Sequence, residues 1–158
     1  MATIYPLPDV PKVKTLLELL FDGLDVKPGK SFDVVSSASW IGLYVSDDGK
    51  PVAACAADTA LAAHAGAALS MLPANAAKEA IKSLNFSPTM LANLQEIMNI
   101  CSRLLMSEAS PHLRLDSLQS SKALAPEVTT VFRSARGRID FELTVPKYGT
   151  GTLAVMSI

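Results

Sequence analysis

The sequence predicts an α+β fold in which an antiparallel sheet packs against three to four helices. Apolar residues between 87 and 106 recur at helical spacing, whereas apolar and polar residues alternate in segments after residue 112. An Asp-Gly pair at residues 48–49 separates two apolar runs, 39–46 and 50–57, and this arrangement is typical of a β-hairpin. Helices grouped between runs of strands favour an α+β fold over a parallel sheet of βαβ units.

Composition predicts a single domain over residues 1–158, because a chain of this length with 49% hydrophobic residues can bury a sufficient core and no linker divides it. The net charge of −1, without long basic runs, argues against nucleic acid as a partner. The N-terminus resembles no secretion signal. The most membrane-like stretch, residues 52–72, contains Asp58 and His64 and falls short of a spanning helix. We therefore expect a cytoplasmic protein that does not bind membranes.

The N-terminal segment predicts an extended arm followed by a helix. Residues 1–11 contain three prolines, which favour extended backbone. A helix is expected to begin at residue 9 or 10, where Pro11 occupies an early and tolerated position, and to end near Gly23. Residues 25–30 are then expected to form a loop.

Two helices are predicted between the hairpin and the long helix. Asp58 is a suitable N-cap for an alanine-rich helix that runs to about Leu72, where Pro73 ends it. Asn75 is expected to cap a shorter helix through Leu84.

The long helix is predicted to begin at Ser87, a serine cap, with Pro88 in the first helical position. At about 100° per residue, Glu96, Asn99 and Arg103 fall on the side opposite the apolar stripe, so we expect them to face outward. The stripe that should pack against the sheet consists of Met90, Leu91, Leu94, Ile97, Met98, Cys101, Leu104 and Leu105.

Four strands are expected after the long helix. Residues 112–119 form the first, and Pro126 introduces a second at residues 128–134. In residues 139–145 apolar and polar side chains alternate, as expected of a half-buried strand, and residues 152–158 form the last strand. An exposed strand edge in such a sheet invites pairing with a second copy, so a homodimer is one expectation.

A carboxylate and a carboxamide at i and i+3, as in Glu96 and Asn99, are neighbours that can enter a partner's cleft together. This E-x-x-N pattern on an exposed helix face resembles the CheC/CheX family of chemotaxis phosphatases. These proteins remove the phosphoryl group from the aspartate of a response-regulator receiver domain. The expected element order is similar to that of CheX from Trp40 to the C-terminus, and more loosely from Lys12. The resemblance implies a CheC/CheX-like fold and a CheY-like receiver as partner in two-component signalling.

The resemblance also implies roles for the polar residues of this helix. A neutral carboxamide can orient an attacking water, because its oxygen accepts and its NH₂ group donates hydrogen bonds, and this task is assigned to Asn99. Glu96 matches the family glutamate that engages a cationic group on the receiver. Arg103, one turn beyond Asn99, is a candidate binding residue. The receiver would supply a divalent metal, so no cofactor of the chain's own is expected.

Two departures from the family pattern leave enzyme activity open. Some relatives carry a second E-x-x-N in the first helix, whereas this chain has Phe21 where the asparagine that follows Glu18 would stand. Small residues usually follow the asparagine in the family, whereas residues 100–103 here are Ile-Cys-Ser-Arg. Arg103 would either contact the receiver or obstruct its docking. The alternative function is therefore a catalytically silent CheX-like interaction or dimerisation module.

Other residues indicate little chemistry. Cys55 and Cys101 lack C-x-x-C spacing and are expected to be buried thiols. His64 has no catalytic partner placed by sequence and is expected to be a helix-surface or packing residue. Polar residues opposite an apolar stripe also occur on any amphipathic surface helix. A third function, a small-ligand sensor, rests on no particular residue.

Overall fold

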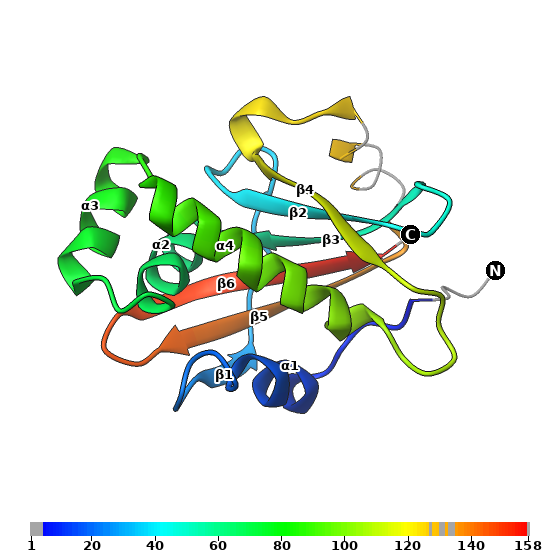
Figure 1. Cartoon of the computed structure of the whole chain (residues 1–158), viewed down its shortest axis with the longest axis horizontal. Helices are drawn as coiled ribbons and strands as arrows, with labels where there is room; N and C mark the ends of the chain where they lie inside the picture. Colours follow the sequence, from blue (N-terminus) through cyan, green and yellow to red (C-terminus); the bar gives the residue numbers. More distant parts are fainter. Residues whose placement is uncertain (1–4, 127, 130–131, 133–134, 158) are drawn as a thin grey trace.

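The computed structural model describes residues 5–126, 128, 129, 132 and 135–157 (Figure 1). The described helices and strands are, in chain order, α1 (Val10–Leu17), β1 (Asp25–Pro28), β2 (Trp40–Val45), β3 (Pro51–Ala57), α2 (Thr59–Ala68), α3 (Ala74–Ser83), α4 (Pro88–Cys101), β4 (Arg114–Ser120), β5 (Gly137–Val145) and β6 (Gly149–Ser157), with short 3₁₀ helices η1 (Ser102–Leu105) and η2 (Ser121–Ala123).

The described strands form one six-stranded sheet in the order β1-β5-β6-β3-β2-β4, and every neighbouring pair is antiparallel. The helices α1, α2 and α4 lie across one face of this sheet, and α3 packs beside α2 (Figure 1). The sequence prediction of an α+β fold with an antiparallel sheet against three to four helices is therefore confirmed. No helix within the described residues is long and apolar enough to cross a membrane.

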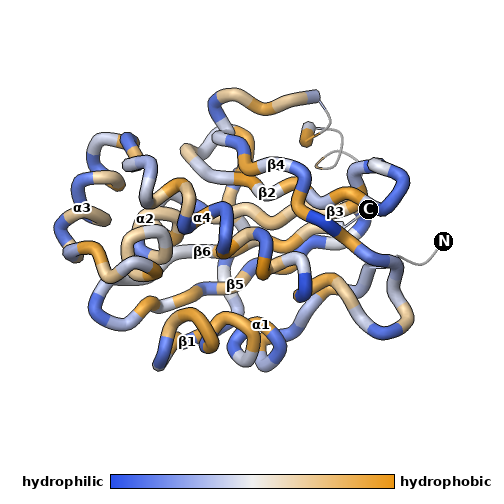
Figure 2. Tube along the Cα trace, viewed as in Figure 1, coloured by the Kyte–Doolittle hydropathy of each residue, from blue (hydrophilic) through white to orange (hydrophobic). Residues whose placement is uncertain are grey.

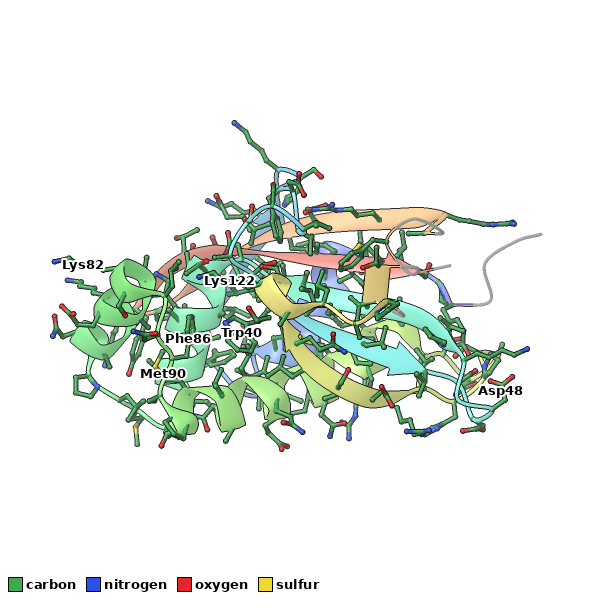
Figure 3. All side chains as sticks on the ribbon, turned by 90° about the horizontal axis from the view of Figure 1, so that it is seen from above. Trp40, Asp48, Lys82, Phe86, Met90 and Lys122 are labelled. Atoms are coloured by element: carbon green, nitrogen blue, oxygen red, sulfur yellow. The ribbon has the colours of Figure 1, made fainter. Side chains whose placement is uncertain are left out.

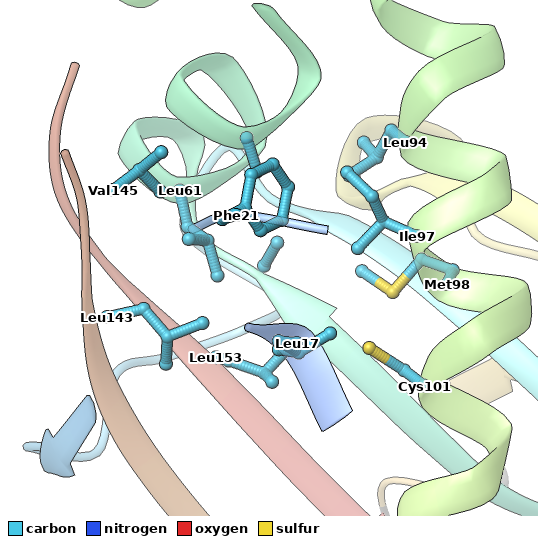
Figure 4. Close-up of a pocket in the computed structure, with 12 residues that line it drawn as sticks. Leu17, Phe21, Leu61, Leu94, Ile97, Met98, Cys101, Leu143, Val145 and Leu153 are labelled. Atoms are coloured by element: carbon cyan, nitrogen blue, oxygen red, sulfur yellow. The ribbon is translucent and has the colours of Figure 1, made fainter. Parts of the chain in front are cut away.

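The principal core lies between the sheet and the helices. Figure 4 shows its centre, where Leu17 and Phe21 meet Leu61 of α2, Ile97 of α4 and Leu153 of β6. A smaller core covers the opposite face of the sheet. Its members are Val34, Ile41, Leu43, Ala54, Ala56, Val128, Ala154 and Met156.

The hairpin is confirmed, and β2 pairs with β3 from Trp40 opposite Ala57 onward. Its turn contains Gly49 at φ 80°, a left-handed conformation that glycine adopts without the steric penalty of a side chain. At the other end of β2, the rings of Trp40 and Phe86 meet edge to face with centroids 5.7 Å apart (Figure 3). This contact ties the start of β2 to the segment before α4.

Of the two predicted caps in this region, Asp58 is correct and Asn75 is not. The Asp58 carboxylate accepts from the backbone N–H of Leu61 at 2.8 Å and from that of Thr152 at 3.1 Å, so it begins α2 and also holds β6. The helix α3 begins directly after Pro73 and has no side-chain cap, so Asn75 lies inside its first turn. Pro73 has an extended ψ of 145° and is the N-cap, so the helix begins at Ala74 and not after Asn75.

Two other predicted segments require correction. Residues 25–30 were expected to be a loop, but Asp25–Pro28 forms the edge strand β1, which pairs with β5. Residues 128–134 were expected to be a strand, yet the described residues Val128, Thr129 and Phe132 are helical. The backbone N–H groups of Val128 and Thr129 bond to Ala125 O, a local pattern that replaces strand pairing. The rest of that segment lies outside the described residues.

Boundaries at both ends of the chain also differ from expectation. The first helix ends at Leu17, and turns carry the chain on to Gly23. The described part of the N-terminal arm has no regular secondary structure before α1, and Tyr5 within it is buried. The last strand begins at Gly149, earlier than the expected residue 152. These shifts leave the order of the elements unchanged.

We predict that Leu94→Ala and Ile97→Ala each lower the free energy of unfolding by about 2–5 kcal/mol, because both side chains are buried and truncation opens a cavity. Glu96→Ala is the matched control on the same helix and should cost less than about 1 kcal/mol, because its side chain is exposed. Thermal denaturation measures all three. Equal losses at the three positions would show that the buried face of α4 is assigned wrongly.

Candidate functional site

The candidate site is the outward face of α4 and η1. Glu96, Asn99 and Arg103 are all exposed, as the helical phase predicted. Within the described residues, the side chains of Glu96 and Asn99 make no hydrogen bond and Arg103 makes no ion pair, so all three are available to a partner. The buried residues of the same segment are Met90, Leu94, Ile97, Met98, Cys101, Ser102, Leu104 and Leu105.

The start of α4 follows the predicted signal. The Ser87 hydroxyl oxygen accepts from the backbone N–H of Met90 at 3.2 Å, and Pro88 is the first helical residue. The cap satisfies one of the backbone N–H groups that a helix start leaves unpaired. Within the helix that begins here, Glu96 and Asn99 are three residues apart and so lie about one turn from each other.

A strand of the sheet holds α4 at the residue next to Asn99. The hydroxyl of Tyr44, in β2, donates a hydrogen bond to Met98 O at 2.5 Å. Burial raises the pKa of Tyr44 well above its usual value, so the phenol keeps the proton that it donates. Two residues earlier in β2, a Cβ added to Gly42 would lie 3.1 Å from the Met98 Cβ, so the missing side chain lets helix and strand approach closely.

A second contact fixes the N-terminal half of α4 against α2. The Asn93 side-chain NH₂ donates to Gly66 O at 2.8 Å and to the Ser70 hydroxyl at 2.7 Å. A Cβ added to Gly66 would lie 3.1 Å from Met90 O, which shows how closely the two helices pack. Because the helix is held on two sides, its outer face is a rigid support for Glu96 and Asn99.

The helix changes its winding after Cys101, two residues beyond Asn99. The Ser102 N–H bonds to Asn99 O and Ile100 O, and the Ser102 hydroxyl also donates to Asn99 O at 2.7 Å. The expected continuous helix to Met106 is therefore an α-helix to Cys101 followed by the 3₁₀ helix η1. This tighter winding carries Arg103, which remains exposed one turn beyond Asn99.

The first helix carries no second polar site. Because α1 ends at Leu17, Glu18 lies at its C-cap and faces Lys14 at 3.9 Å. Phe21, at the position of the missing asparagine, is buried in the core behind α4. The second E-x-x-N motif is therefore missing for a structural reason: the position of its asparagine is occupied by a core residue, Phe21.

The other candidate groups lie away from this face. Cys55 and Cys101 are buried free thiols, as predicted. Contact with the Cys55 thiol, together with burial, raises the pKa of Cys101 well above its usual value, so this thiol is unreactive. His64 is buried against Gly149, and burial lowers its pKa, which fits a packing role. No group of three His, Cys, Asp or Glu residues within the described part of the chain is placed to hold a metal.

An apolar cavity of about 20 Å³ lies behind α4, between the helices and the sheet (Figure 4). Ligand pockets for small organic molecules are typically about 300–1,000 Å³, so this cavity offers no such site. The small-ligand sensor considered from sequence gains no support from it.

Comparison with known proteins identifies the fold. No protein-family model and no curated protein sequence matches the chain. Among solved structures it is similar to CheX in the complex of CheX with CheY, beryllium trifluoride and Mg²⁺ from Borrelia burgdorferi, with 13% identity, a TM-score of 0.56, and coverage of 94% of this chain and 97% of that chain. The chain has a CheC/CheX-like fold.

Two further structures share this fold. The middle domain of FliM from Vibrio alginolyticus is 11% identical, with a TM-score of 0.56 over 93% of this chain and 86% of that chain. FliY from Thermotoga maritima is 11% identical, with a TM-score of 0.55 over 92% of this chain and 82% of that chain. At these identities the likeness shows the fold alone. The CheC/CheX-like resemblance expected from sequence is confirmed at that level, and the roles of Glu96, Asn99 and Arg103 remain predictions.

Sequence reasoning placed the exposed residues but missed those that position them. Gly42, Tyr44 and Asn93 act through contacts with segments distant in the chain, and no local pattern predicts such pairs. The alternation of β2 indicates only that two residues separated by one share a face of the sheet. Gly42 and Tyr44 therefore share the face that α4 covers.

We predict that Tyr44→Phe lowers the free energy of unfolding by about 0.5–1.5 kcal/mol, because the ring remains while the hydrogen bond to Met98 O is lost. Urea denaturation measures the loss. Tyr148→Phe is a comparison in which another hydroxyl-to-carbonyl bond, to Leu72 O, is removed away from α4. The amide resonances around Met98 should shift in Tyr44→Phe and stay in place in Tyr148→Phe, and the reverse pattern would contradict the assigned contact.

Proposed function

We propose that the chain binds a phosphorylated CheY-like receiver domain through the outer face of α4 and accelerates hydrolysis of its aspartyl phosphate. The observation that carries the proposal is the pair Glu96 and Asn99, exposed, unpaired within the described residues and one turn apart on a helix held by the sheet and by α2. The CheX of similar fold was solved in complex with CheY, beryllium trifluoride and Mg²⁺, which supports a receiver as the partner.

Asn99 is proposed to orient the attacking water. Phosphoryl transfer depends mainly on positioning the nucleophile in line and on stabilising spread charge. The Asn99 oxygen would accept a hydrogen bond from the water, while its NH₂ group would donate to a phosphoryl oxygen. The water oxygen bonds to phosphorus as the bond between phosphorus and the aspartate oxygen breaks, which yields inorganic phosphate and a free aspartate. The metal would belong to the receiver.

Glu96 is proposed to dock a cationic group of the receiver. Its carboxylate lies on the same helical face as Asn99 and is exposed. An ion pair formed as the two surfaces meet would exclude water and fix the approach of Asn99 to the phosphoryl group. Glu96 therefore contributes to binding and orientation, whereas Asn99 acts on the reacting atoms.

A silent interaction module is the second candidate function, and one observation favours it. The residue after Asn99 is the half-buried Ile100, and the exposed Arg103 projects from the same helical face. Side chains of this width keep another backbone farther from Asn99 than small residues would. In this case the face would bind a receiver without changing the lifetime of its phosphate.

The decisive experiment measures the decay of acyl phosphate on each receiver domain of the organism that encodes the chain, with and without the protein. Accelerated decay is the expected result. Binding to a receiver whose phosphate lifetime stays unchanged would refute catalysis at this site for that receiver and support the silent module.

We predict that Asn99→Ala lowers the accelerated rate at least about tenfold, a loss of transition-state stabilisation above about 1.4 kcal/mol, while the fold and most receiver affinity remain. Asn85→Ala, which changes an exposed asparagine before α4, is the matched control and should retain activity. Single-turnover dephosphorylation at saturating protein measures the effect. A rate in Asn99→Ala equal to that of the wild type would remove Asn99 from the mechanism.

Glu96→Ala should behave differently from Asn99→Ala. Because Glu96 is proposed to dock the receiver, its loss should mainly weaken binding, and the rate defect should shrink as receiver approaches saturation. A titration of dephosphorylation rate against receiver concentration separates the two effects. A defect that persists undiminished at saturation would place Glu96 in the chemical step instead of in docking.

A further inference from the structure

A groove of about 410 Å³ separates α1 from η1, beside the candidate site. Arg103 forms part of its wall, and this residue lies one turn beyond Asn99. The groove is therefore continuous with the face that is proposed to meet the receiver. It is lined by Pro11, Lys12, Thr15, Leu16, Leu19 and Arg103.

Local structure keeps this groove open. The Lys12 Nζ donates to Met106 O at 3.1 Å, which holds the beginning of α1 against the end of η1. Since α1 ends at Leu17, the chain turns away and leaves Leu19 on the surface. Figure 2 shows a hydrophobic stretch at α1 and the turn after it, next to the end of α4.

The groove combines an apolar floor with cationic groups. Leu19 is 79% exposed, so the groove presents a large aliphatic side chain to a partner. Within the described residues neither Arg103 nor Lys12 has an ion-pair partner, and the Lys12 Nζ bonds to a neutral carbonyl, Met106 O. The two acidic residues at the ends of α1 have other contacts: the Asp9 carboxylate accepts from the backbone N–H of Lys12 at 3.0 Å, and Glu18 faces Lys14. The groove is therefore complementary to an apolar side chain next to a carboxylate.

We propose that this groove is a second docking surface for the receiver domain and that Leu19 and Arg103 select among receivers. The inference rests on the proposed function and adds a contact beyond Glu96 and Asn99. Once Asn99 reaches the phosphoryl group, a receiver loop beside that group would lie over η1 and place an apolar side chain on Leu19. A carboxylate on that loop would pair with Arg103, whose planar guanidinium suits two parallel hydrogen bonds.

Leu19 offers a test that leaves the core and the reacting groups untouched. Leu19→Asp and the milder Leu19→Ser alter an exposed side chain, so the fold should persist. Met71, which is 87% exposed at the turn between α2 and α3, provides the matched controls Met71→Asp and Met71→Ser. This turn lies at the other end of α4 from the groove (Figure 1).

The measurement is the dissociation constant of each variant for a receiver loaded with beryllium trifluoride and Mg²⁺, determined by calorimetry, together with the dephosphorylation rate at saturating receiver. Leu19→Asp should raise the dissociation constant at least about tenfold and Leu19→Ser at least about threefold, while both Met71 variants stay within about twofold of wild type. The saturated rate should remain that of wild type in all four, because Asn99 is unchanged.

Charge reversal tests the second part of the groove. Arg103→Glu should raise the dissociation constant more than Arg103→Ala, because the receiver carboxylate would then meet a like charge. Equal effects of the two substitutions would overturn the assignment of a carboxylate to this position. Tighter binding of Arg103→Ala than of wild type would show that Arg103 obstructs docking.

The outcomes separate this inference from the proposed function. Suppose that the wild-type protein binds and dephosphorylates the receiver, and that both Leu19 variants bind it with unchanged affinity. The groove is then not a docking surface, and the proposed function still stands. A wild-type protein that neither binds nor dephosphorylates any receiver overturns both.

Discussion

The close contact between β2 and α4 at Met98 is the constraint on which the site depends. Gly42 has no side chain and so lets α4 approach β2 closely. The Tyr44 hydroxyl then holds α4 in position on the sheet through its hydrogen bond to Met98 O. Once Met98 faces the sheet, the helical repeat places Glu96 and Asn99 on the outer side, because residues two before and one after it point away. The exposure of the two candidate groups therefore follows from one buried contact, and a change in helix phase would move both groups at once.

Local signals predicted much of the fold. The Asp-Gly pair at residues 48–49, the cap at Asp58 and the cap at Ser87 each satisfy backbone groups within a few residues, so the sequence around them is sufficient. The strand at residues 25–28 escaped prediction because it is short and gains its stability from pairing with β5. The described part of residues 128–134 is helical although its composition is β-branched, and buried Val128 packs against the second face of the sheet.

The residues of the candidate site could be predicted from the sequence, but the contacts that hold them in place could not. Helical phase alone indicated that Glu96, Asn99 and Arg103 share an exposed face, and the structure places them there. The bonds that hold this face join residues 54 and 27 positions apart in the chain, and sequence spacing contains no information about such contacts. The groove at Leu19 likewise depends on where α1 ends. The helical spacing of the leucines predicted an end near Gly23, whereas the helix ends at Leu17.

The most direct test of the central claim is the side-chain amide spectrum of the four asparagines, recorded with and without a receiver loaded with beryllium trifluoride and Mg²⁺. The NH₂ resonances of Asn99 should shift or broaden as the receiver binds, because this group would meet the phosphoryl mimic. Those of Asn93, already bonded to Gly66 and Ser70, should stay in place. Receiver binding that leaves the Asn99 resonances unchanged would contradict the account.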